Sequence, residues 1–558
     1  MKSLHFLSFI LLLIIMSCST KNLTLTKDQI VSGKNLVPPE PGKTPGYWCT
    51  WSAQNYSVDS LTIIKSLLGI EGHSIIARNL TEERVFGKDG WAKEYSPVHS
   101  DLYLLFDLGW DIHDTMNFDN SRWKLGSQVV ATDKFPSCTG TPSERLKKLN
   151  DLCKKAGWRG AAIWIPSQGW EDGKNNRPLS DQQMESYFRE RARWAHDAGI
   201  EYWKVDYGSR GSDIEFRKLV TRIAKEEAPG LWVEQCRGGG PLNDFDCPWD
   251  CKSSSSGEFA KWCNGEKLNS SINLLGFSQI LRTYDVTPYL SIPTTLDRVG
   301  QILNGCAGKD QITGILNCED EPYIAAALNC MTGILRHSSF LTVKGYDYDP
   351  LVAHKRCDEV VRAVRWQRIA PATGAGLTGV ILDSVRLTDT WKIVKGASWV
   401  TWLTGSKVKQ SAPARISRNM SLPLVKCDSL QPFVISSKHL NGAVTVATLT
   451  RHDATRGFYF PLADVSVLVE DFQSPVAVFG RYKSLSIKYK KLPVAFKVYA
   501  QDLAGDVVYD ISGLIERKRN TLKLSGKLIE TAGLSAASPG DLSDPGLILK
   551  IMVETPIK

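Results

Sequence analysis

The chain has 558 residues, of which 42% are hydrophobic and 23% are charged, and its formal net charge is +9. This length exceeds what one compact core holds, so two or three domains are expected. The positive charge is spread along the chain without a dense block of Lys and Arg, which argues against a nucleic-acid partner.

Residues 1–18, MKSLHFLSFILLLIIMSC, are predicted to be a lipoprotein signal peptide. One Lys precedes an apolar run that is short for a membrane helix, and the run ends at a small residue followed by Cys18. We expect a lipid on Cys18 to be the only membrane anchor of the mature chain. The protein would then be exported to the periplasm or outer membrane of a bacterium. The alternative is plain secretion, with Cys18 lost in the peptide.

A polar, Pro- and Gly-rich linker is predicted over 19–45, and a (β/α)8 TIM barrel over 46–376. Short apolar runs alternate with helical patterns that end in Gly, which indicates a parallel sheet. A doubly wound sheet is the competitor, but no Gly-rich phosphate loop follows the first strand. The predicted strands are 47–51, 101–110, 160–165, 200–206, 230–236, 277–285, 314–318 and 338–343, and the clearest helices are 143–157, 181–199 and 214–230.

The helical patterns vanish at about residue 377, and short strands separated by turn residues follow, such as AVTVATLTR and SLSIKY. This pattern predicts an all-β sandwich over 377–558. A sandwich behind a barrel either binds glycan or supports the barrel, and support is the favoured interpretation.

Thirteen Cys occur, and twelve of them follow Cys18, so some are expected to pair in an exported protein. Cys247, Cys251 and Cys263 are close enough in sequence for a local disulfide, although the connectivity stays open. A zinc site there is disfavoured, because no His lies nearby at ligand spacing. No metal or organic cofactor is expected.

The chemistry is expected at the carboxyl ends of the barrel strands. In YWKVDYG, alternation places Lys204 and Asp206 on one face of a strand, where Lys and Asp are costly unless they are paired or working. Two carboxylates that flank a scissile bond are the working parts of most glycosidases. The candidates at strand ends are Trp51, Asp107, Trp110, Asp111, Lys204, Asp206, Glu234, Arg282, Asp285 and Asp320.

Motifs follow one another in order over 46–345: PGYWCTW, YLLFDLGW, YWKVDYG, EQCRGGG, LRTYDV and NCEDEPYIAAALNCMTG. They resemble the strand motifs of the retaining α-glycosidase clan of the α-galactosidases and α-N-acetylgalactosaminidases, glycoside hydrolase families 27 and 36. YWKVDYG is similar to the Lys-x-Asp nucleophile strand, and LRTYDV to the Arg-x-x-Asp acid/base motif. EQCRGGG is similar to the fifth-strand motif of the family 36 branch.

The resemblance implies that Asp206 is the nucleophile and that Asp285 is the general acid and then the base. Asp285 would need a raised pKa to hold its proton. Lys204 would hold sugar hydroxyls and keep Asp206 ionised. The implied substrate-binding residues are Trp51, Asp107, Trp110, Lys204, Cys236, Gly238 and Arg282, with Cys236 and Gly238 near the 2-position of the sugar.

One departure from the family pattern concerns the sugar. The second strand of the family carries two adjacent acids, whereas this chain has Asp107 followed by Leu108, which cannot accept a hydrogen bond. Asp111, three residues on, is a candidate substitute. The expected reaction is double displacement on a terminal α-galactoside-type linkage of an oligosaccharide, polysaccharide or glycoconjugate. An α-N-acetylgalactosaminide, a β-L-arabinopyranoside or an α-glucoside is the alternative substrate, and a non-catalytic glycan-binding lipoprotein is the alternative function.

Several of these residues also have a plainer interpretation. Asp206 and Asp320 could each cap a helix, and Asp285 could belong to a turn. Lys204 could form a structural pair with Asp206, and Glu234 could be another structural partner of Lys204.

Overall fold

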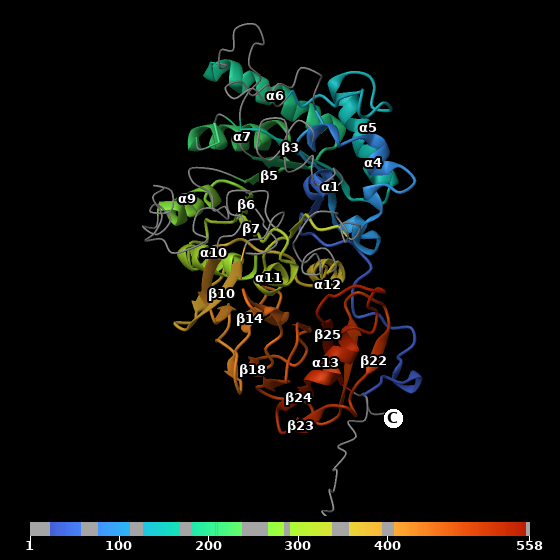
Figure 1. The fold of residues 1–558 in the computed structure, drawn as a ribbon, viewed down its shortest axis with the longest axis vertical. Coiled ribbons are helices and arrows are strands. Elements are labelled where there is room, and N and C mark those ends of the chain that lie inside the picture. Colours follow the sequence, from blue (N-terminus) through green and yellow to red (C-terminus); the bar gives the residue numbers. More distant parts are fainter. Residues whose placement is uncertain are drawn as a thin grey trace, which may run out of the picture.

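A computed structural model gives the fold and describes residues 23–56, 76–111, 127–167, 180–206, 208, 210–211, 213–236, 266–283, 291–337, 356–392 and 407–553. Within these ranges the chain forms a barrel of alternating strands and helices, followed by a β-rich domain (Figure 1). This arrangement confirms the predicted fold class. Among the helices described, none has the length and apolar character needed to cross a membrane.

The barrel sheet has eight strands in the order β7-β6-β5-β4-β3-β2-β1-β8, and all neighbours are parallel. A parallel bridge between Asn317 and Met331 joins the two ends of the sheet, so the barrel is nearly closed. The strands are β1 (Tyr47–Cys49), β2 (Tyr103–Phe106), β3 (Gly160–Ile165), β4 (Tyr202–Val205), β5 (Trp232–Gln235), β6 (Ile280–Arg282), β7 (Ile315–Asn317) and β8 (Gly333–Ile334).

The last barrel strand differs from the sequence prediction. The structure places β8 at Gly333–Ile334, whereas the predicted segment 338–343 lies outside the described residues. Two residues are too few to show an alternating pattern, so this strand has no period that a sequence reveals. Backbone contacts define it instead, because Asp320 donates its N–H to the Gly333 carbonyl at 2.7 Å.

The predicted helices are present with nearly the predicted bounds. At the start of α5 (Pro142–Lys155) and of α6 (Asp181–Ala198), the side chains of Thr141 and Ser180 form capping boxes with the third helical residue. Gly199 ends α6 at a φ of 67°, which favours glycine. The other helices described in this part of the chain are α1 (Trp51–Tyr56), α4 (Glu82–Phe86), α7 (Ile214–Glu227), α9 (Glu266–Leu275), α10 (Ser291–Cys306), α11 (Pro322–Ala327) and α12 (Asp358–Gln367).

The C-terminal part contains two large sheets and two hairpins. The strand order is β22-β21-β25-β19-β15-β14-β12-β9 in the larger sheet and β13-β18-β20-β24-β23 in the smaller one, while β10 pairs with β11 and β16 with β17. The strands of the larger sheet are β9 (Val380–Leu382), β12 (Arg415–Arg418), β14 (Phe433–Lys438), β15 (Val444–Leu449), β19 (Val476–Phe479), β21 (Phe496–Asp502), β22 (Val508–Asp510) and β25 (Gly546–Val553). The remaining elements are β10 (Arg386–Lys392), β11 (Lys407–Pro413), β13 (Leu424–Lys426), β16 (Arg451–Asp453), β17 (Gly457–Tyr459), β18 (Asp464–Val469), β20 (Ser484–Tyr489), β23 (Glu516–Lys518), β24 (Thr521–Ser525) and helix α13 (Gly526–Gly533).

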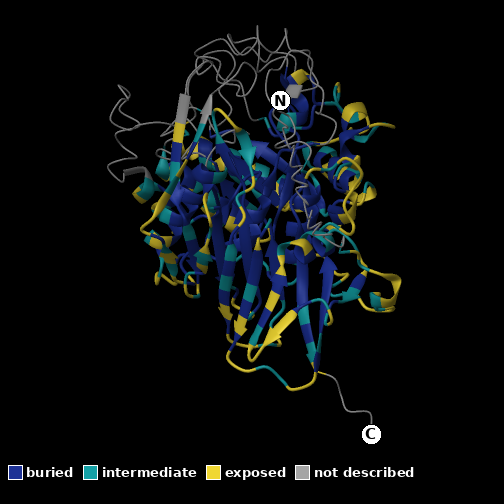
Figure 2. Cartoon of the chain, turned by 60° about the horizontal axis from the view of Figure 1, so that its bottom comes forward, coloured by how far each residue is buried: buried dark blue, intermediate teal, exposed yellow. Residues whose placement is uncertain are grey.

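The larger sheet is buried on both faces. Val434 of β14 faces a core shared with the smaller sheet, which makes this part a sandwich. Its neighbours Phe433 and Ile435 face the opposite way, into a core shared with the barrel helices α10, α11 and α12. Figure 2 shows these strands dark blue over much of their length. The barrel and the sandwich are therefore joined by a continuous apolar interface.

A linker is predicted before the barrel, over residues 19–45. The described residues of this segment, 23–45, contact the sandwich. Val31 donates its backbone N–H to the carbonyl of Val508 at 2.9 Å, and the side chains of Asn35 and Gln501 are hydrogen-bonded at 2.8 Å. Leu23 and Leu25 pack against the sandwich core. The segment thus runs along the edge of the larger sheet before it enters β1.

Candidate active site

Strand register turns a set of polar side chains toward the axis of the barrel. Lys204 of β4 lies opposite Glu234 of β5, and Arg282 of β6 lies opposite Asn317 of β7. Because alternate residues share a face, positions two residues further along point the same way. The polar and ionisable side chains at the carboxyl ends of the strands include Asp107, Lys204, Asp206, Glu234, Cys236, Arg282 and Glu319, and all of them are buried.

Asp107 and Lys204 form an ion pair inside the barrel. The Lys204 Nζ lies 3.0 Å from Asp107 Oδ2, and the Cys49 thiol donates to the same oxygen at 3.1 Å. Burial lowers the pKa of Lys204, but Asp107 and Cys49 raise it, and the balance lies well above its ordinary value. Burial and Asp107 raise the pKa of the Cys49 thiol well above its ordinary value. Lys204 is therefore charged and Cys49 protonated at neutral pH.

Asp206 follows directly after β4 and has both carboxylate oxygens engaged. Trp164 of β3 donates its indole N–H to Oδ2 at 3.0 Å, and Arg282 of β6 reaches Oδ1 at 3.4 Å. The side chain is 12% exposed, compared with 6% for Asp107 and 0% for Glu319. Of these three acids, Asp206 is thus the one most open to a molecule from outside.

Arg282 also contacts Glu319, a residue that the sequence analysis did not single out. The distance from its guanidinium to Glu319 Oε2 is 3.0 Å, and Glu319 is fully buried. Strand parity could have revealed it, because Glu319 lies two residues after the inward-facing Asn317. The predicted candidate in this region, Asp320, turns elsewhere: its φ is +59°, and its carboxylate accepts from the guanidinium of Arg336 at 3.1 Å.

Glu234 accepts hydrogen bonds from several neutral groups. The Tyr47 hydroxyl donates at 3.2 Å, the Cys236 thiol at 3.1 Å and the Asn317 amide at 3.3 Å, and the Tyr202 hydroxyl is also a donor. Burial raises the pKa of Tyr47, Tyr202 and Cys236 well above their ordinary values, so these donors keep their protons. This cluster holds Glu234 in the barrel interior, level with Lys204 of the ion pair.

Two predicted tryptophans and two residues that follow the second strand lie among or beside apolar clusters. Trp51 is half-buried and packs against the apolar residues inside the barrel. Trp110 is fully buried in the layer between the strands and the outer helices and donates its indole N–H to the Trp164 carbonyl at 2.8 Å. Leu108 is buried among the apolar residues of the barrel interior. Asp111 is buried and accepts the Gln128 backbone N–H at 2.8 Å.

Other predictions concern residues outside the described part of the chain. These are the acid/base candidate Asp285, Gly238 near the sugar's 2-position, and the local cysteines Cys247, Cys251 and Cys263. Residues 1–18, with the lipidation candidate Cys18, are also outside it. The export signal and these roles remain predictions.

Comparisons with known proteins found structural likeness only. No family model matches the chain, and no curated protein matches it. A family 27 β-L-arabinopyranosidase from Geobacillus stearothermophilus matches 92% of this chain and 98% of its own, with 11% identity and a TM-score of 0.40. The α-galactosidase I from Mortierella vinacea matches 91% of this chain and 96% of its own, with 12% identity and a TM-score of 0.35. An α-galactosidase from Saccharomyces cerevisiae with raffinose matches 91% of this chain and 95% of its own, with 10% identity and a TM-score of 0.34. At these identities and TM-scores, the function must be argued from the site itself.

Proposed function

We propose that the protein is a retaining glycoside hydrolase with Asp206 as its nucleophile. The observation that carries this proposal is the placement of Asp206 at the carboxyl end of β4. It is held there by the Trp164 indole and the Arg282 guanidinium, and it is more exposed than Asp107 and Glu319. A nearby cation and an N–H donor favour the ionised form of a carboxylate and fix its orientation, and attack on an anomeric carbon requires both.

The reaction proceeds in two displacements. In the first, an Asp206 oxygen bonds to the anomeric carbon, while the glycosidic bond breaks and the leaving oxygen takes a proton from a general acid. In the second, water loses a proton to the same group, attacks the anomeric carbon and releases Asp206, so the configuration is retained. We assign the acid and base role to Asp285 from the Arg-x-x-Asp motif.

The proposed substrate is a terminal α-galactoside-type linkage. Asp107 and Lys204 are an acceptor and a donor, fixed 3.0 Å apart, that can bind adjacent hydroxyls of one sugar ring. A β-L-arabinopyranoside is the second candidate, because Leu108 stands where the family has an acid and lies in an apolar cluster. That sugar resembles α-galactose but lacks the 6-hydroxymethyl group, so it needs one partner fewer.

The test is Asp206→Asn, which keeps the size of the side chain and removes its charge. We expect hydrolysis of aryl α-galactoside and β-L-arabinopyranoside to fall about 10³-fold or more, because the variant lacks the attacking carboxylate. NMR of the first-formed sugar should show the substrate's anomer with the parent enzyme. A variant as active as the parent would remove Asp206 from the mechanism, and an inverted first product would exclude double displacement.

A further inference from the structure

Arg282 lies between two buried carboxylates. Its guanidinium is 3.4 Å from Asp206 Oδ1 and 3.0 Å from Glu319 Oε2, and the Arg282 side chain is 5% exposed. The proposed mechanism uses Asp206 but gives no role to Glu319. A second carboxylate at this place needs an explanation, because burying a charged group is costly unless a partner compensates it.

Glu319 is held on a rigid part of the barrel. Cys318 donates its backbone N–H to the Met331 carbonyl at 2.9 Å, and Asp320 donates to the Gly333 carbonyl at 2.7 Å. These bonds close the barrel on both sides of Glu319 in the sequence. The backbone at Glu319 is therefore fixed, so its carboxylate stays within one side-chain length of the barrel wall and acts as a counter-charge for Arg282.

The charge on Asp206 changes during the proposed reaction, whereas the charge on Glu319 does not. When Asp206 bonds to the sugar, it becomes a neutral ester, and Arg282 loses the attraction of one of the two carboxylates that pair with it among the described residues. A guanidinium that keeps an anionic partner in a buried site avoids much of the cost of this loss. In the free enzyme, sharing also weakens the hold of Arg282 on the attacking oxygen.

We infer that Glu319 is a positioning residue that draws Arg282 back from Asp206, so that the nucleophile stays reactive and the covalent intermediate stays charge-balanced. This inference rests on the proposed function. The charged and titratable groups of the buried cluster that contains Asp206, among the residues the structure describes, are Arg282, Glu319, Lys204, Asp107, Glu234 and the thiols of Cys49 and Cys236.

Glu319→Gln tests the inference, because the amide keeps a hydrogen bond to Arg282 but lacks the charge. We expect kcat/KM for aryl glycosides to fall about 10- to 100-fold, because the covalent step now leaves Arg282 with a weaker partner. The acid limb of the kcat/KM profile should move about 0.5–1 pH unit lower, since Arg282 now lies closer to Asp206 and lowers its pKa. Glu319→Asp, which keeps the charge, should restore the position of the acid limb.

The control is Asp310→Asn, which removes an exposed carboxylate before β7 and should leave both quantities unchanged. Melting temperatures of all variants separate a folding defect from a kinetic one. If the parent is active and Asp206→Asn is not, an unmoved acid limb in Glu319→Gln overturns the inference alone. If the parent hydrolyses no glycoside, the proposed function fails and the inference fails with it.

Discussion

At the scale of single residues, Asp111 is a carboxylate whose burial opposes its ionisation. Burial raises its pKa to about 6, although the Gln128 N–H and Lys134 act in the opposite direction. Its Oδ1 has no hydrogen-bond partner among the residues that the structure describes. The ionised form is thus less favourable in the folded chain than in the unfolded chain, where the pKa of Asp is about 3.9.

The sign of the resulting pH dependence follows from this difference. The protonated Asp111 carboxyl contributes to the free energy of unfolding, and this contribution is fully present below about pH 4 and is lost as the pH rises through about 6. We expect Asp111→Asn to be more stable than the parent at pH 7.5, and the difference to grow by about 2 kcal/mol between pH 4.5 and 7.5. Urea unfolding at both pH values measures it. Parallel pH curves for parent and variant would contradict the prediction.

Side-chain alternation along the strands predicts only part of the site. Parity along β4 predicted that Lys204 and Asp206 share one face of the strand, and parity depends only on an extended backbone. It fails after a residue with a positive φ, because the chain turns there. Gly109, with a φ of 109°, precedes Trp110, and Asp320 itself has a φ of 59°. A left-handed Asp has no sequence signature strong enough to predict, so the sequence does not show that Asp320 turns out of the barrel, whereas parity from Asn317 points to Glu319.

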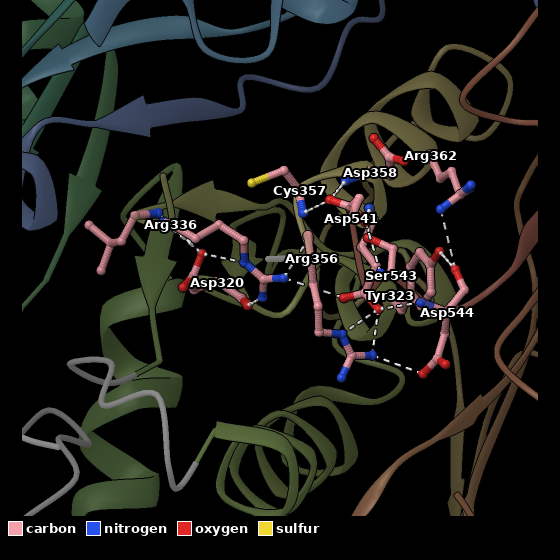
Figure 3. Close-up of polar contacts among 12 residues, drawn as sticks. Asp320, Tyr323, Arg336, Arg356, Cys357, Asp358, Arg362, Asp541, Ser543 and Asp544 are labelled. Carbon is pink, nitrogen blue, oxygen red and sulfur yellow. Dashed lines mark hydrogen bonds and ion pairs between the residues drawn. The ribbon is translucent and has the colours of Figure 1, made fainter. Parts of the chain in front are cut away.

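At the scale of elements, helix α12 obtains its N-terminal cap from the sandwich. Its own N-cap residue, Cys357, has helical dihedral angles and forms no side-chain cap. Asp541, in the loop before β25, accepts the backbone N–H groups of Cys357 at 2.8 Å and Asp358 at 3.2 Å (Figure 3). Ser543 accepts that of Glu359 at 3.0 Å. The first backbone N–H groups of a helix have no partner within the helix. In α12 they bind acceptors on a segment more than 180 positions away in the sequence.

Removing this cap should cost what other helix caps cost. We expect Asp541→Ala to lower the free energy of unfolding by about 1–2 kcal/mol. Asp541→Asn keeps an acceptor oxygen and should stay within about 0.5 kcal/mol of the parent. Burial raises the pKa of Asp541, so the loss of its charge carries little cost. Chemical denaturation measures both variants, and equal losses would show that charge rather than hydrogen bonding matters.

The same interface carries a chain of ion pairs from the barrel rim into the sandwich. Arg336, which follows β8, pairs with Asp320 at 3.1 Å, and Arg356 pairs with Asp544 at 2.8 Å (Figure 3). Both arginines also pair with Glu359 of α12, Arg336 at 3.3 Å. These contacts link segments that the sequence assigned to separate domains. They favour the interpretation that the sandwich supports the barrel.

At the scale of the whole molecule, local periodicity predicted the architecture and long-range contacts decided the rest. The helix over 181–199 and the strand over 160–165 were predictable because their apolar spacing and caps are local. The two-residue strand β8 and the double burial of the larger sheet were not, because both are set by partners distant in the chain. The boundary at 376 was drawn from a change in pattern, but α12 of the barrel shares one apolar core with the sandwich.

This shared core predicts that barrel and sandwich unfold as one unit. Arg362 of α12 and Asp502 of β21 form a buried ion pair across the interface, at 2.9 Å. Arg362→Met leaves Asp502 buried without this cation, and we expect a loss of about 3–5 kcal/mol. Arg365→Met on the same helix is the matched control, because it removes another buried Arg side chain whose partner, Asp506, is 72% exposed and stays solvated without the cation.

Calorimetry and tryptophan fluorescence can follow these variants together. Arg362→Met should lower the melting temperature of a single transition, since the apolar cores on both sides of the larger sheet share its strands. The Arg365→Met transition should stay near that of the parent. Two resolved transitions in the parent would show that the sandwich folds apart from the barrel. An equal loss of stability in both variants would show that the buried pair does not hold the two domains together.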